Sequence, residues 1–182
     1  MLQVTTNVDG ANSTKPLLQA VRLLIRNFKN LNMSYDSKAD TLLHIKRVSQ
    51  LLNEAAIKLI ERGNVHDNSK LEEPEKADFD RLTPLLKTLT YGSEEYKASL
   101  VELQVALKHH YANNSHHPEH YENGVNGFDL FDLMEMFFDW KAATERTKDG
   151  NIYKSIEHNK GRFELSEQVC QIFKNTAERL GW

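Results

Sequence analysis

The segment from Phe128 to Arg146 is apolar on nearly all sides and still carries several carboxylates. A helix that is apolar all round belongs inside a fold, so this segment predicts a helix covered by other helices. Its acidic residues Asp132, Glu135 and Asp139 are spaced so that they share one helix face. Because ionised carboxylates are costly to bury without compensation, this face is predicted to meet positive charge.

The rest of the chain repeats apolar residues every three or four positions, the period of amphipathic helices. Helices are predicted over residues 15–31, 37–62 and 93–110, with starts near Pro74 and Pro84, and as a short and a longer helix at the C-terminal end. Only 8 glycines and 4 prolines interrupt these patterns. We expect an all-α fold, a single helical bundle over residues 15–182, after a disordered lead-in over residues 1–14.

The last helix is predicted to place one apolar side inward. The residues on that side are Leu165, Val169, Ile172, Phe173, Ala177 and Leu180, and Cys170 is predicted to be ordinary packing.

Composition and charge argue against several classes of protein. A formal net charge of −3 argues against general nucleic-acid binding, which needs a basic surface. The single cysteine cannot form an internal disulfide, and no apolar run approaches the roughly 18 residues of a membrane span. We expect a cytoplasmic protein that does not span a membrane. The basic amphipathic helix at residues 15–31 also suits a membrane surface or a partner, but packing on its own domain is favoured.

A run of polar residues follows the helix-stop signal Gly63-Asn64 and contains the adjacent pair His66 and Asp67. This pair offers one imidazole nitrogen and one carboxylate oxygen, a mixed set that suits zinc, manganese or iron. A His-Asp pair alone is a weak signal. It gains weight because six of the eight histidines lie in this run or between His109 and His120.

Other histidines are placed by helix geometry. The apolar stripe of residues 93–110 puts His110, and not His109, on the inward side. His44 lies at the edge of the preceding stripe, where a lone histidine is usually a hydrogen-bonded core residue. Its helix leads directly to His66, which favours a ligand. The histidine-rich run is interpreted as part of a site, and the alternative is an adventitious surface chelator.

The distance along the helix axis decides which carboxylates of the apolar helix can bind the same ion. At a rise of 1.5 Å per residue, Asp132 and Asp139 lie roughly 10 Å apart along the axis and cannot bind the same ion. Asp139 is the candidate ligand, and Glu135, one turn away, is a candidate partner that orients a histidine.

Several acidic residues also have interpretations that involve no metal. For Glu135 and Asp139 the alternative is a salt bridge to Arg146 or Arg162. The cluster Glu72, Glu73 and Glu75 is predicted to be a solvated first turn of a helix, favoured by the helix dipole.

Taken in chain order, His44, His66-Asp67 and Asp139 resemble the HD-domain superfamily of metal-dependent phosphohydrolases. That superfamily carries a lone histidine, a His-Asp pair and a distant aspartate on a helical bundle. The resemblance covers about residues 41–147 and implies an HD-like bundle. The segment HDNSK is similar to an extended form of the motif, whose lysine, here Lys70, points toward the active site.

Further segments extend the resemblance. His116-His117-Pro-Glu is similar to an element of members with two metals, although the six residues between His110 and His116 depart from the usual spacing. The run from HIKRVSQLL to EMFFDWKAAT also resembles an uncharacterised family of short bacterial and phage proteins, from which no activity follows.

The resemblance implies one or two divalent metal ions, manganese, magnesium, zinc or iron, that activate water to attack a phosphate ester. The implied ligands are His44, His66, Asp67, His110, His116 and Asp139, with Asp67 between the ions and His117 as an alternative to His116. Lys70 would contact phosphate, and His117 or His120 would protonate the leaving oxygen. Arg146 is a further candidate for substrate contact.

The first hypothesis is a phosphohydrolase that acts on a nucleotide or another small phosphate ester. One alternative is a di-iron oxygenase of the same superfamily that cleaves C–C or C–P bonds. Another is a non-catalytic, metal-containing protein that binds a nucleotide, such as a phage factor. The identity of the bound metal and the release of phosphate distinguish the three hypotheses. The sequence does not determine the substrate, or whether the protein forms a homo-oligomer.

Overall fold

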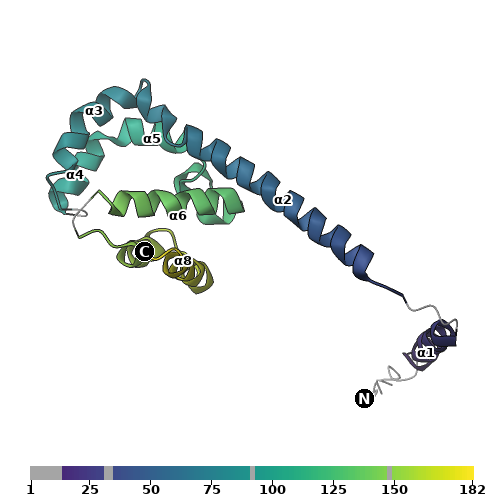
Figure 1. Cartoon of the computed structure of the whole chain (residues 1–182). Helices are drawn as coiled ribbons and strands as arrows, with labels where there is room; N and C mark the ends of the chain where they lie inside the picture. The colour runs from purple at the N-terminus through teal and green to yellow at the C-terminus, as the bar shows by residue number, and fades with distance from the viewer. Residues whose placement is uncertain (1–13, 31–34, 91–92, 147–148) are drawn as a thin grey trace, which may run out of the picture. The chain divides into compact units, whose positions relative to one another are not determined.

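The computed structural model describes residues 14–30, 35–90, 93–146 and 149–182 (Figure 1). It divides into two compact units, residues 1–50 and 51–182. The expected lead-in at residues 1–14 lies outside the described residues except for Thr14, the first residue of a helix. A single bundle over residues 15–182 stays a prediction.

The described residues contain helices and no strand, which confirms the all-α fold. The helices are α1 (Thr14–Asn30), α2 (Lys38–Val65), η1 (Asn68–Leu71), α3 (Glu75–Leu86), α4 (Glu94–Glu102), α5 (Gln104–Asn113), η2 (Pro118–His120), η3 (Gly124–Gly127), α6 (Leu130–Thr144), α7 (Ile152–Arg162) and α8 (Glu167–Arg179). None of them, within the described ranges, combines the length and the hydropathy needed to cross a bilayer.

The first unit contains α1 and the first part of α2. The apolar residues Leu17, Val21 and Leu24 of α1 are exposed. The prediction that this helix packs on its own domain therefore stays a prediction.

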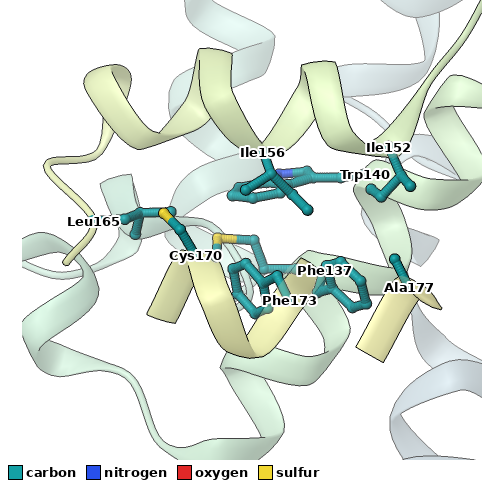
Figure 2. Close-up of a cluster of buried hydrophobic side chains, with 9 residues drawn as sticks. Phe137, Trp140, Ile152, Ile156, Leu165, Cys170, Phe173 and Ala177 are labelled. Carbon is teal, nitrogen blue, oxygen red and sulfur yellow. The ribbon is translucent and has the colours of Figure 1, made fainter. Parts of the chain in front are cut away.

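The second unit has its larger core between α6, α7 and α8 (Figure 2). Phe137 stacks on Phe173 with ring centroids 4.7 Å apart, and Ile156 from α7 is fully buried beside them. A smaller cluster of Leu82, Leu103 and Ala106 joins α3 to α5. The larger cluster includes residues of α6 and the smaller one includes residues of α3 and α5.

The apolar side of α8 was predicted well but not fully. Leu165, Phe173 and Ala177 are buried, and Cys170 is a free, buried thiol, as expected. Ile172 and Leu180 are 56% and 48% exposed, so their predicted inward position is wrong. The stripe is narrower than predicted because α8 packs mainly against α7.

Two helix boundaries differ from the sequence predictions. Pro84 lies inside the last turn of α3 and does not start a helix. The helix predicted over residues 93–110 is two helices, α4 and α5, which meet at Leu103. Helix α6 begins at a capping box, in which the Asp129 side chain accepts from the backbone N–H of Asp132.

Replacing Ile156 by alanine should lower the free energy of unfolding by about 2–5 kcal/mol, because a fully buried side chain leaves a cavity. Urea unfolding followed by circular dichroism measures this change. The matched control is Ile172→Ala on α8, which should cost less than about 0.5 kcal/mol because the side chain is exposed. Equal losses in both variants would contradict the assigned core.

Candidate metal centre

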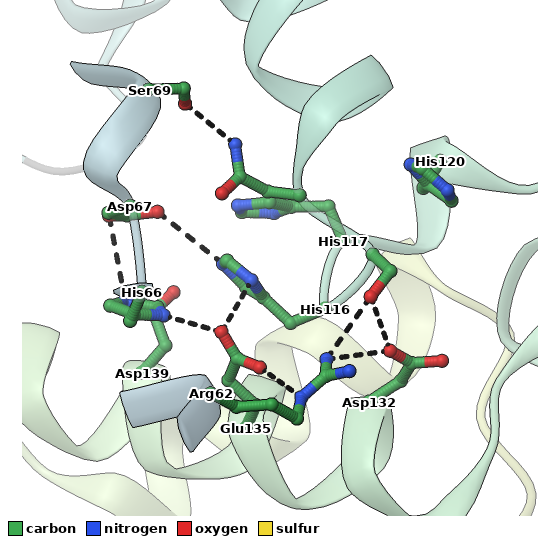
Figure 3. A network of polar contacts seen from close by, with 12 residues as sticks. Arg62, His66, Asp67, Ser69, His116, His117, His120, Asp132, Glu135 and Asp139 are labelled. Carbon is green, nitrogen blue, oxygen red and sulfur yellow. Dashed lines mark hydrogen bonds and ion pairs between the residues drawn. The ribbon is translucent and has the colours of Figure 1, made fainter. Parts of the chain in front are cut away.

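Histidines and aspartates from four segments of the second unit meet at one place (Figure 3). His66 and Asp67 follow the end of α2, His110 lies in the last turn of α5, and Asp139 lies on α6. His116 and His117 come from the loop between α5 and η2. Asp67 adopts the left-handed conformation with φ 58°, which aspartate tolerates better than most residues and which turns its carboxylate toward the histidines.

The ring nitrogens surround the Asp67 carboxylate. The Nε2 atoms of His110 and His116 lie 3.2 Å and 3.6 Å from Asp67 Oδ1. His66 Nε2 lies 3.6 Å from Asp67 Oδ2 and also 3.6 Å from Asp139 Oδ1. His110 Nε2 and His117 Nε2 are 2.9 Å apart.

The donor atoms form two groups, each able to hold a metal ion. One group contains Asp67, His110, His116 and His117, and the other contains His66, His116 and Asp139, with ligand atoms within 4.8 Å of one another in each. His116 belongs to both groups.

Two atoms of the centre are buried without a hydrogen-bond partner among the described residues, namely Asp67 Oδ1 and His116 Nε2. Buried polar atoms are nearly always paired, so each orphan calls for an explanation. Both atoms belong to the donor group that contains His110 and His117, and a cation among these donors would satisfy both at once. The donor set therefore fits a metal ion.

Carboxylates contact the Nδ1 side of three histidine rings, opposite the Nε2 atoms that face the centre. Glu135 Oε1 accepts from Nδ1 of His66 at 2.8 Å and from Nδ1 of His116 at 3.0 Å. Glu75 Oε2 lies 3.0 Å from Nδ1 of His110. A histidine that donates from Nδ1 keeps its lone pair on Nε2, so these carboxylates leave three Nε2 atoms able to coordinate a metal.

The buried position of Glu75 corrects the sequence interpretation. Glu75 was predicted in a solvated first turn, but it is 0% exposed and also accepts from Nδ1 of His109 at 2.7 Å and from the hydroxyl of Ser69 at 3.1 Å. Its sequence resembles an ordinary acidic helix start, and only the packing of α3 against α5 brings it to the histidines. His109 is 40% exposed and His110 only 1%, which confirms the predicted orientation of the pair.

Arg62 is the functional residue that sequence analysis missed. Its Nε donates to Glu135 Oε2 at 2.6 Å, and its Nη2 donates to Asp132 Oδ1 at 2.7 Å and to the Ser115 hydroxyl at 3.1 Å. The acidic face of α6 does meet positive charge, but from α2. Arg62 lies in the last turn of α2, four residues before His66, and this spacing was the available signal.

The two arginines proposed as partners of Glu135 lie elsewhere. Arg162 pairs with Glu119 at 2.7 Å, and Arg146 is exposed, two residues beyond the end of α6. Asp132 accepts from the Tyr121 hydroxyl at 2.8 Å and stays outside both donor groups, as its distance from Asp139 along the helix requires.

The pKa values of two histidines in the centre are shifted in opposite directions. Hydrogen bonds to Asp139 and Glu135 raise the pKa of His66 to about 10, against the effect of burial. Burial, with His116 and His110 nearby, lowers the pKa of His117 to about 3. Burial alone would raise the pKa of Asp67, but His110 and Lys70 outweigh it and lower that pKa well below its usual value. Asp67 is therefore ionised, as a metal ligand must be.

Lys70 lies directly beside the centre. Its Nζ donates to Asp67 Oδ2 at 2.6 Å and lies 5.2 Å from the ring centroid of Phe79. The ammonium group is therefore positioned next to the proposed ligand carboxylate, where a bound anion would also meet it.

Two other predicted site residues lie outside the donor groups. His44 is exposed on the part of α2 that belongs to the first unit. His120 is exposed and its Nδ1 donates to the Tyr111 carbonyl at 2.7 Å, a bond that does not involve its Nε2. Their roles, like the substrate contact of Arg146, stay predictions.

Replacing Arg62 by methionine should destabilise the metal-free protein by about 2–3 kcal/mol, because Asp132 and Glu135 lose their charged donor. Urea unfolding in the presence of a chelator measures the change. Arg81→Met is the matched control, since Arg81 makes only exposed ion pairs, and it should change stability little. If the two variants behaved alike, the Arg62 contacts would not hold α2 to α6.

Comparisons with known proteins add one finding. Neither the curated proteins nor the solved structures gave a significant match. Residues 33–179, well over half of the chain, match the profile of a family described as "Family of unknown function (DUF5662)". The chain therefore belongs to the DUF5662 family.

Proposed function

We propose that this protein is a metal-dependent phosphohydrolase that acts on a nucleotide or another small phosphate ester. The observation that supports it best is the pair of donor groups around Asp67, with two buried atoms that lack hydrogen bonds. Such a cluster of imidazoles and ionised carboxylates is suited to zinc, manganese or iron.

The geometry suggests how the ligands divide between two ions. His116 has only Nε2 to offer, because its Nδ1 is held by Glu135, so it can bind one ion at a time. If His116 binds the same ion as His66 and Asp139, the other ion keeps Asp67, His110 and His117 as ligands. His116 then takes the place that the family resemblance implied for His44.

Divalent ions bound there would lower the pKa of a coordinated water and neutralise charge on the phosphoryl oxygens. Asp67 offers one oxygen toward His110 and the other toward His66, so its carboxylate lies between the two groups. The Lys70 ammonium can exchange its bond with Asp67 for one with a phosphate oxygen.

The proton for the leaving group is assigned to His120. His117 lies among the donor nitrogens and its pKa is lowered to about 3, so it would be a poor proton donor at neutral pH. His120, with Nε2 unengaged by its Tyr111 bond, is the remaining candidate of the two.

The first experiment is elemental analysis of the purified protein, followed by phosphate release from nucleoside monophosphates and triphosphates with manganese, magnesium, zinc or ferrous iron. The proposal expects bound metal and release with at least one of these ions. Bound iron with oxygen uptake and no phosphate release would instead favour the di-iron oxygenase. Tight nucleotide binding without turnover would favour a non-catalytic protein.

The variant Asp67→Asn separates metal binding from folding, because asparagine also tolerates the left-handed backbone of residue 67. It should lose bound metal and all activity. Lys70→Met should keep its metal and lose activity by about 10²-fold or more, through the lost positive charge. Metal content and kcat/KM measure these effects.

The matched control for Lys70 is Lys76→Met, which removes an exposed lysine paired with Asp80. This variant should keep both metal and activity. Full metal content and full activity in Asp67→Asn would contradict the proposed centre.

A further inference from the structure

A cleft of about 350 Å³ lies between α2 and α6 and ends at the candidate metal centre. Its lining at the polar end includes His66 and Asp139, two members of one donor group. Leu59, Gly63, Phe138 and Ala142 line the remainder. A cleft of this size, with apolar walls and a few converging polar groups, is typical of a small-molecule site.

We propose that this cleft holds the organic group of the substrate, and that this group is uncharged and apolar or aromatic. The inference rests on the proposed phosphohydrolase function. Phe138 is 40% exposed, so part of its ring is open to contact with a ligand, and Trp182 supports it at 5.7 Å between ring centroids.

Charge in the cleft narrows the substrate class further. The lining contains one permanently charged cation, Arg62, and its guanidinium is already bonded to Glu135 and Asp132. The lining also contains the carboxylates Glu135 and Asp139, and Glu135 already accepts from Arg62 and His66. Because the Arg62 guanidinium is already paired, the lining offers no free guanidinium to a negatively charged organic group, which favours an uncharged one.

Gly63 determines how much room the cleft offers. It lies within α2, and a Cβ added at this position would meet nothing within 4 Å. A side chain on residue 63 would therefore occupy the cleft without displacing protein atoms. Glycine costs about 1 kcal/mol relative to alanine inside a helix, and open space for a ligand is a reason to retain it.

The test compares benzyl phosphate with methyl phosphate, two monoesters whose leaving alcohols have similar acidity. The wild-type protein should show a kcat/KM for benzyl phosphate about tenfold or more above that for methyl phosphate, because only the benzyl group fills the cleft.

The variant Gly63→Leu should reduce the benzyl-to-methyl ratio of kcat/KM to near one, and Gly63→Ala should reduce it by a smaller factor. The alanine variant is compatible with the helix and keeps the test valid if the leucine variant fails to fold. Asn64→Leu is the matched control, since Asn64 is exposed and outside the cleft lining, and it should keep the wild-type ratio.

The outcomes distinguish the two proposals. Hydrolysis of both esters with a wild-type ratio near one, or with a ratio that Gly63→Ala and Gly63→Leu leave unchanged, would overturn the cleft assignment and leave the phosphohydrolase standing. Absence of phosphate release from every ester and nucleotide, with each metal supplied, would overturn both.

Discussion

The ion pairs of Arg62 with Asp132 and Glu135 are the interaction on which the site of the second unit depends. They join α2 to two carboxylates of α6, Asp132 and Glu135, which are 3% and 12% exposed. Neither carboxylate could be ionised cheaply in such a position without a charged donor. By neutralising them, Arg62 allows an otherwise apolar helix to present an acidic face, and it holds the end of α2, with His66 and Asp67, against that face.

The same carboxylates connect packing to chemistry. Glu135 receives Arg62 on one oxygen and the Nδ1 atoms of two histidines on the other, so one residue fixes the helix contact and the ring orientations together. Glu75 does the same for His110 from α3. Each ring is thus set with Nε2 toward the centre, and the cost of burying the polar atoms there falls once a cation joins them.

Much of this arrangement could be predicted from the sequence, in particular the inward face of α5 and the convergence of His66, Asp67, His116 and Asp139. Helical periodicity was sufficient for the first, and the resemblance to the HD-domain superfamily implied the second. The roles of Glu75 and Arg62 could not be predicted in this way, because an acidic helix start and an arginine near a helix end are common on solvated surfaces. The sequence left His116 and His117 as alternatives, and only the path of their loop placed both among the donors, because a loop has no periodicity to follow.

The sequence by itself determined that the chain is all-α, which residues of each helix share a face, and that imidazoles and carboxylates are concentrated in a few segments. These properties are local, since they depend on spacing along one helix. Only the tertiary structure decided which charge meets which, that Arg62 and not Arg146 or Arg162 serves α6, and that a cleft opens beside His66. Such pairings depend on which helices come into contact. The free energy of each pairing depends on two residues far apart in the sequence, so the residue spacing within one segment does not reveal it.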